Sequence, residues 1–152
     1  MSGVWSTGFI GRGAPLGADL NLIVEVGLGV ALLGGMALAR RGWYRGHGAC
    51  QSTVFLVVVL LTVVWMGPSL HDNYGPSLFA GDVNRVNVAV GAHIVIGTVA
   101  LLLGAYVVLV AGTPFVPKRL RFHDYKPWMR TLLALWWLAI LLGALTYWLA
   151  TS

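Results

Sequence analysis

The sequence predicts an all-α integral membrane protein, a four-transmembrane-helix bundle with both termini on the outer (periplasmic or extracellular) side of the membrane. The composition is the first indication: of 152 residues, 58% are hydrophobic and 10% are charged, whereas soluble domains average about 25% charged residues. At about 20 apolar residues per span, the chain has room for four spans with short loops, and no separate soluble domain fits. The placement of Lys and Arg is the second indication, because it predicts the orientation.

The chain begins with an arm, residues 1–19, that contains five glycines and a proline. The first span is predicted over residues 20–39, where Asp19 or Asn21 can cap the helix. Glu25 lies about one turn into this span, where a carboxyl is costly unless it is paired, protonated or in contact with water. We consider two roles for Glu25: it tunes a site or relays a proton, or it reaches the lipid headgroups from the interface.

The second span is predicted over residues 52–70 and ends at Gly67-Pro68. The third is an apolar run over residues 87–112. The fourth covers residues 128–150 and has aromatic residues at both ends, which favour the headgroup layer. Together with the first span these runs form the transmembrane domain, residues 20–150.

Within the third span, His93, Gly97, Ala100 and Gly104 share one narrow stripe at about 100° per residue. Small residues at this spacing let another helix, or something flat, come close. An ionisable residue inside a membrane helix indicates a functional site. The stripe is therefore either a helix-packing seam or a seam that also borders a ligand through His93, Gly97 and Gly104.

Eight of the ten Lys and Arg residues lie in or beside the first and third connections, and only Arg12 and Arg85 lie on the other side. The eight are Arg40, Arg41, Arg45, Lys118, Arg119, Arg121, Lys126 and Arg130. The positive-inside rule places these two connections in the cytoplasm and both termini outside. The basic excess thus indicates topology in a cytoplasmic (inner) membrane with anionic lipid nearby, and no nucleic-acid partner.

The four histidines form one pair near each membrane face: His47 and His123 on the cytoplasmic side, His71 and His93 near the outer face. Opposed imidazoles on different helices are what bis-histidine haem b ligation requires. Two imidazoles with a carboxylate or with the Cys50 thiolate are instead suited to copper or another transition metal. We favour the outer pair because His93 lies inside its span, and we keep His47 and His123 as a second candidate pair. Either pair can also be without a ligand.

Distance restricts what two such sites can do together. His47 and His71 are 24 residues apart, about 36 Å if the segment is helical, which exceeds the hydrocarbon core of about 30 Å. Two haems would lie at opposite surfaces, so one site or two independent sites fit better than a two-haem electron pathway. Quinone binding near His71 or His93 stays open.

Several landmarks occur in a characteristic order along residues 21–149. They are Asn21, His47, His71, Phe-Ala-Gly at 79–81, Arg85, Ala-His-Ile at 92–94, His123 with Lys126, and Gly143 with Tyr147. In these landmarks the chain resembles the four-span bacterial and archaeal membrane family, of unknown function, that includes the cytochrome oxidase assembly factor CtaM. The chain departs from the family pattern at Gly48 and Asp124, where a basic residue is usual. The resemblance implies a link to maturation of haem-containing terminal oxidases or to respiratory membranes.

From these observations we predict a histidine-ligated haem b or metal-binding membrane subunit of a respiratory or electron-transfer complex. The alternative is a cytochrome oxidase (haem or copper) assembly factor or a non-redox structural subunit. That the protein is an independent enzyme is the least favoured hypothesis. The expected partners are the lipid bilayer and other membrane subunits, and the expected cofactor is haem b, with copper or no cofactor as alternatives.

Overall fold

The computed structural model describes residues 8–112, 117, 119, 121 and 124–152, which form an all-helical protein. Four helices are long and apolar enough to span a membrane, as predicted. They are α1 (Leu16–Arg40), the composite helix Tyr44–Phe79, α5 (Arg85–Gly112) and α6 (Tyr125–Ala150). The protein is therefore a multi-pass membrane protein in contact with a lipid bilayer.

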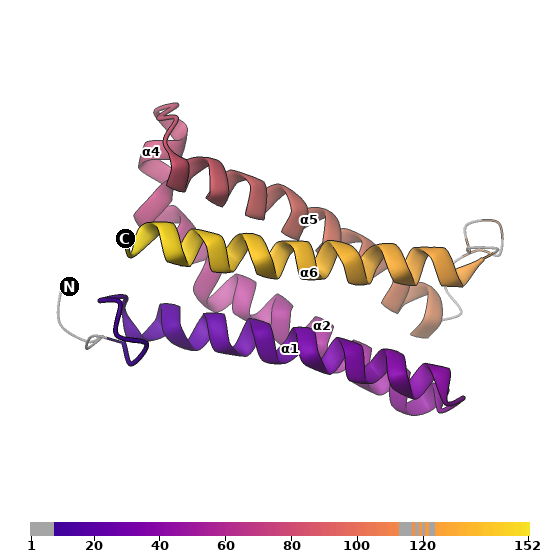
Figure 1. Ribbon diagram of the computed structural model, residues 1–152. Coiled ribbons are helices and arrows are strands. Elements are labelled where there is room, and N and C mark those ends of the chain that lie inside the picture. Colours follow the sequence, from indigo (N-terminus) through magenta and orange to yellow (C-terminus); the bar gives the residue numbers. More distant parts are fainter. Residues whose placement is uncertain (1–7, 113–116, 118, 120, 122–123) are drawn as a thin grey trace.

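The four long helices form one bundle (Figure 1). α5 packs along α6, α6 packs on α1, α1 packs along α2 (Tyr44–Leu61), and α2 closes the ring against α5. The start of α1 and the end of α6 lie at the same end of the bundle (Figure 1). The Arg12 Nε donates a 2.8 Å hydrogen bond to the Thr151 hydroxyl, which ties the two ends together. The bundle geometry thus puts both described chain ends on one side.

The first helix begins at Leu16, directly after Pro15, four residues before the predicted start of the span. Asp19 consequently lies inside the first turn and does not cap it. Its side chain is 1% exposed, and it accepts hydrogen bonds from the Ile10 N–H at 2.8 Å and from the Tyr147 hydroxyl at 2.6 Å. Through these two hydrogen bonds, the Asp19 carboxylate connects the N-terminal arm and α6 to the start of α1.

The second helix does not end at Gly67-Pro68 but continues to Phe79. It passes from α2 through the π-helical segment η1 (Thr62–Met66), α3 (Gly67–Ser69), a second π-helical segment η2 (Leu70–Tyr74) and α4 (Gly75–Phe79). A proline lacks an N–H and clashes with the carbonyl four residues earlier. In each Gly-Pro pair the glycine N–H instead donates to the carbonyl five residues earlier, from Gly67 to Thr62 and from Gly75 to Leu70. The wider π turns absorb the prolines without breaking the helix.

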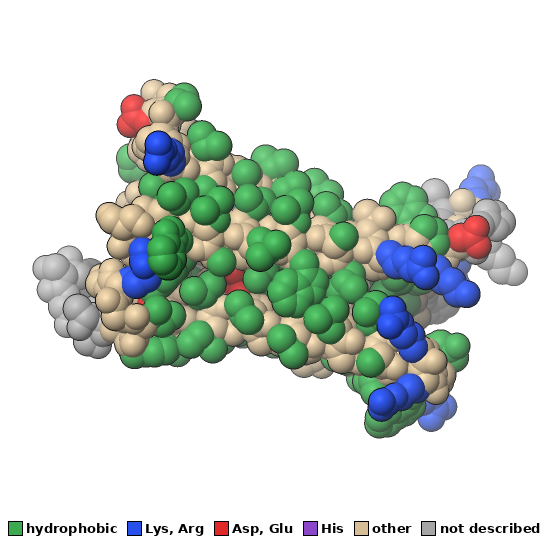
Figure 2. Space-filling view, in the orientation of Figure 1, with side chains coloured by type: hydrophobic (Ala, Val, Ile, Leu, Met, Phe, Trp, Pro, Cys, Tyr) green, Lys and Arg blue, Asp and Glu red, His purple; other side chains and the backbone are tan. Residues whose placement is uncertain are grey.

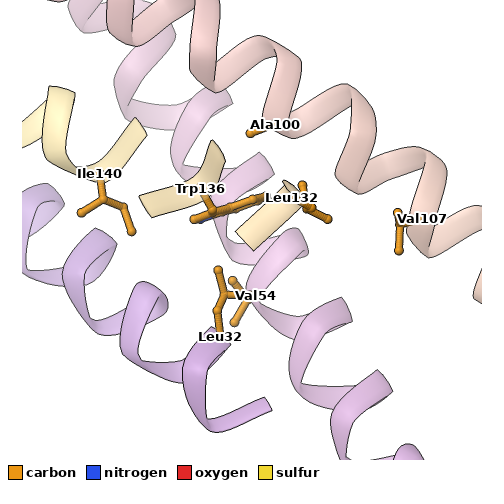
Figure 3. Close-up of a cluster of buried hydrophobic side chains, with 7 residues drawn as sticks. All are labelled: Leu32, Val54, Ala100, Val107, Leu132, Trp136 and Ile140. Carbon is orange, nitrogen blue, oxygen red and sulfur yellow. The ribbon is translucent and has the colours of Figure 1, made fainter. Parts of the chain in front are cut away.

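The buried core lies where the four helices meet (Figure 3). Trp136 of α6 is at its centre, 8% exposed. The core residues are Leu32, Val54, Ala100, Val107, Leu132, Trp136 and Ile140. Figure 2 shows hydrophobic side chains over the outer face, and Lys and Arg side chains mainly at the end away from the start of α1 and the end of α6. This distribution is that of a bundle whose middle faces lipid and whose one end is strongly basic.

Candidate functional site

The stripe on α5 faces two internal cavities. His93, Gly97 and Ala100 line a small cavity of about 60 Å³, and Gly104 lines a larger one of about 490 Å³. Trp136 borders both cavities, which are partly open to the surface. Small residues of α5 thus line both cavities.

In the small cavity, the His93 imidazole is held from α6. Its Nδ1 lies 2.9 Å from the carbonyl oxygen of Ala139. Because a carbonyl oxygen can only accept a hydrogen bond, Nδ1 is the donor in this contact. In its neutral form the His93 ring therefore offers Nε2 to a metal ion or to a hydrogen-bond donor.

Glu25 of α1 borders the same cavity and is 8% exposed. Its carboxyl accepts a hydrogen bond from the Asn21 side chain, one turn earlier. A Cβ atom at Gly143 would lie 3.1 Å both from Glu25 Oε2 and from His93 Cε1. Because position 143 has no side chain, the carboxyl and the imidazole approach the same point on α6. Figure 2 shows acidic atoms among hydrophobic ones, away from either end of the bundle.

The π-helical segment η1 contributes two further side chains to the small cavity, Thr62 and Met66. The Thr62 hydroxyl donates to the Val58 carbonyl at 2.8 Å and lies 3.8 Å from Met66 Sδ. Sequence reasoning missed both residues. The available sequence signal was the Gly67-Pro68 pair, which directly follows the π turn, and π turns are frequent at functional sites.

The larger cavity lies at the basic end of the bundle. Its volume is within the range of about 300–1,000 Å³ that is typical of ligand and cofactor sites. Its walls are mostly apolar and aromatic, and its polar lining comes from Arg40, Tyr44, His47, Gln51, Tyr125, Lys126 and Arg130. None of the described residues that line it is acidic. This cavity therefore suits an apolar ligand that carries negative charge at one edge.

His47 of α2 lines the larger cavity, and its ring is held from α1. The Nδ1 lies 2.8 Å from the Gly35 carbonyl oxygen and donates to it, so Nε2 is the ring nitrogen without a part in this contact. A Cβ atom added at Gly35 would lie 3.0 Å from Gln51 Nε2 and 3.2 Å from Cys50 Sγ. A glycine at position 35 thus lets α1 and α2 come close enough for this contact.

The other predicted ligands are placed differently. The His71 side chain is 86% exposed and its Nδ1 lies 2.8 Å from the carboxylate of its neighbour Asp72. His71 does not line the cavity that His93 borders. The Cys50 thiol donates to the Ala31 carbonyl at 3.2 Å and lines neither cavity, and His123 lies outside the described residues. Within the described part of the chain, no three His, Cys, Asp or Glu residues gather around one point.

Comparison with known proteins adds no family assignment. The chain matches no protein-family model, and comparisons with curated proteins and with solved structures gave no match either. The family resemblance described above therefore stays an expectation. The function is therefore inferred from the residues that line the two cavities.

Proposed function

We propose that the protein is a haem b-binding subunit of a respiratory or electron-transfer membrane, and that the larger cavity would hold the haem, with His47 binding its iron. The observation that carries the proposal is the state of the His47 ring. The Gly35 carbonyl holds its Nδ1 at 2.8 Å, His47 lines a large, mostly apolar cavity, and Nε2 is the nitrogen that would bind the haem iron. Histidines that bind metals typically donate their other ring N–H to a backbone carbonyl in this way.

The cavity also fits the shape and charge of haem b. A haem is flat and apolar except for two propionates, and it needs an apolar slot with cations at one edge. Arg40, Lys126 and Arg130 line the cavity at the helix ends, and Arg and Lys form strong charge-assisted hydrogen bonds with carboxylates. At Gly104 the Phe55 and Trp136 side chains pack directly against α5, and both contribute aromatic surface to the lining of the cavity.

When bound, the haem supplies one-electron transfer, and the protein sets its environment. Trp136 and Leu132 are buried core residues and would give a bound haem an apolar wall on their side of the cavity. By the positive-inside rule the basic end faces the cytoplasm. The proposal therefore puts the haem near the cytoplasmic face of the inner membrane, held by His47 and not by the outer pair, His71 and His93.

A second candidate function is a haem-handling factor for cytochrome oxidase assembly. Among the described residues, His47 is the single histidine that lines the larger cavity. A haem held by one axial ligand exchanges more easily than a bis-histidine haem. If this function is correct, the haem-loaded protein transfers its haem to apomyoglobin within minutes, whereas an electron carrier retains it.

The experiment that tests haem binding is a dithionite-reduced minus oxidised visible spectrum of the detergent-purified protein. We expect a reduced-minus-oxidised haem b difference spectrum in the wild type and in His71→Ala, which changes an exposed histidine outside the cavity. The bands should be lost in His47→Ala. Bands of wild-type intensity in His47→Ala, or no haem bands in any of the three proteins, would overturn the proposal.

A further inference from the structure

We infer that the small cavity is a binding site for a single Cu(I) ion, with Glu25 of α1, Met66 of η1 and His93 of α5 as its ligands. The three residues come from three different segments and line one cavity of about 60 Å³. This volume is far below the cofactor range of about 300–1,000 Å³ but is sufficient for one ion. The inference is independent of haem binding in the larger cavity, with which this cavity shares one described lining residue, Trp136.

Charge balance selects a monovalent ion. Glu25 is 8% exposed in the interior of the bundle, and the described residues that line its cavity include no Lys or Arg. A carboxylate inside a membrane is costly unless it is protonated, paired with a cation or in contact with water. An imidazole that binds a metal through Nε2 is neutral, and a thioether has no charge. One Cu(I) ion in place of the carboxyl proton therefore gives a site without net charge, whereas a divalent ion would leave a positive charge in the membrane interior.

The donor types also favour Cu(I). Soft thioether sulfur selects Cu(I), and imidazole suits copper as well. The Thr62 hydroxyl lies 3.8 Å from Met66 Sδ and already donates to the Val58 carbonyl. Thr62 thus supports the methionine side chain at the cavity and does not act as a ligand. The π turn of η1 is what brings both side chains to this point of the helix.

Two of the three ligands have the supporting contacts that metal ligands commonly have. The His93 Nδ1 is bonded to the Ala139 carbonyl at 2.9 Å, and the Glu25 carboxyl is bonded to Asn21. Such outer partners orient the ligands and raise metal affinity. Gly143 completes the arrangement, because its missing side chain leaves the space in which Glu25 and His93 meet.

The test is an anaerobic Cu(I) titration of the purified protein in competition with the chelator bicinchoninate. We expect one Cu(I) per chain in the wild type. Met66→Leu and Glu25→Gln should each weaken the affinity by about 10–100-fold or more. The matched control is Met129→Leu, the same substitution on a residue that lines only the larger cavity, and it should keep the wild-type affinity. Circular dichroism checks that each variant keeps its helix content.

A second measurement excludes the lone thiol as the sulfur ligand. The Cys50→Ser variant keeps a hydroxyl that can donate to the Ala31 carbonyl, and it should keep Cu(I) affinity and the sulfur signal in X-ray absorption at the copper edge. Loss of copper in Cys50→Ser, equal affinity in wild type and Met66→Leu, or no Cu(I) bound by the wild type would each overturn the inference. The haem bands of the His47 cavity are recorded on the same samples, so failure of one site is distinguishable from failure of the other.

Discussion

Single glycines determine where polar groups meet inside this bundle. At Gly143 an added Cβ would lie 3.1 Å from both Glu25 and His93, whereas at Gly97, on the facing helix, it would meet nothing within 4 Å. Both glycines lie in apolar helices and look alike in sequence. Only the placement of α1 against α6 distinguishes them, so Gly143 was recognised from sequence as a landmark and not as part of a site.

Alanine at these two glycines should therefore have opposite effects on stability. Gly97→Ala should be neutral or stabilise by up to about 1 kcal/mol, because alanine is the better helix former. Gly143→Ala should destabilise relative to it by about 1–3 kcal/mol, because the added atom crowds two polar side chains. Unfolding in SDS, followed by circular dichroism, measures both. Equal stability of the two variants would show that the close approach at Gly143 does not exist.

The Tyr147–Asp19 hydrogen bond is a second residue-scale feature with a measurable consequence. Tyr147→Phe leaves the Asp19 carboxylate with one donor fewer, so this variant should unfold at a lower SDS fraction than the wild type. Tyr44→Phe, at a residue that is 72% exposed, is the control and should change stability little. The same SDS unfolding assay compares them, and an unchanged Tyr147→Phe variant would contradict the burial of this contact.

At the scale of the elements, apolar run length and small-residue spacing were sufficient to predict four helices and the inward-facing stripe of α5. The continuation of the second helix was not predictable from these signals. A Gly-Pro pair ordinarily marks a helix end, and here two pairs are absorbed by π turns at Thr62–Met66 and Leu70–Tyr74. The turn that brings Met66 to the small cavity depends on tertiary packing, so this member of the site could not be found from sequence.

Helix packing in a bilayer depends on close contact between side chains, because lipid is as apolar as the core. Leu32 of α1 is 5% exposed in the core, and its neighbour Leu33 is 40% exposed towards lipid. Leu32→Ala should therefore cost about 2–5 kcal/mol of unfolding free energy through the cavity it leaves, whereas Leu33→Ala should stay within about 0.5 kcal/mol. Thermal or SDS unfolding distinguishes them, and equal losses would mean that the face of α1 is misassigned.

At the scale of the whole molecule, the charge distribution predicts the orientation and the bundle geometry makes it testable. The end of α6 and the arm that precedes α1 are joined by Arg12, and most basic residues are at the opposite end (Figure 2). Composition and Lys/Arg placement predicted this overall arrangement from sequence. They did not predict which histidines reach a cavity, because that depends on the rotation of each helix.

Cysteine labelling in intact cells tests the orientation. In a Cys50→Ser background, a membrane-impermeant maleimide should label Ser152→Cys from outside, because positive-inside topology puts the end of α6 there. It should label Tyr44→Cys, at the basic end of the bundle, only after permeabilisation. The reverse pattern would contradict the proposed topology and move the His47 cavity to the outer face.

The central claim is that the cavity beside His47 binds a haem b. The most direct measurement is the haem content of the detergent-purified protein, determined as pyridine haemochrome per polypeptide after expression with sufficient haem supply. We expect close to one haem b per chain in the wild type and close to none in His47→Ala purified in parallel. If the wild-type protein has the helix content of the four-span bundle and still contains no haem b, that result would contradict haem binding in the cavity beside His47.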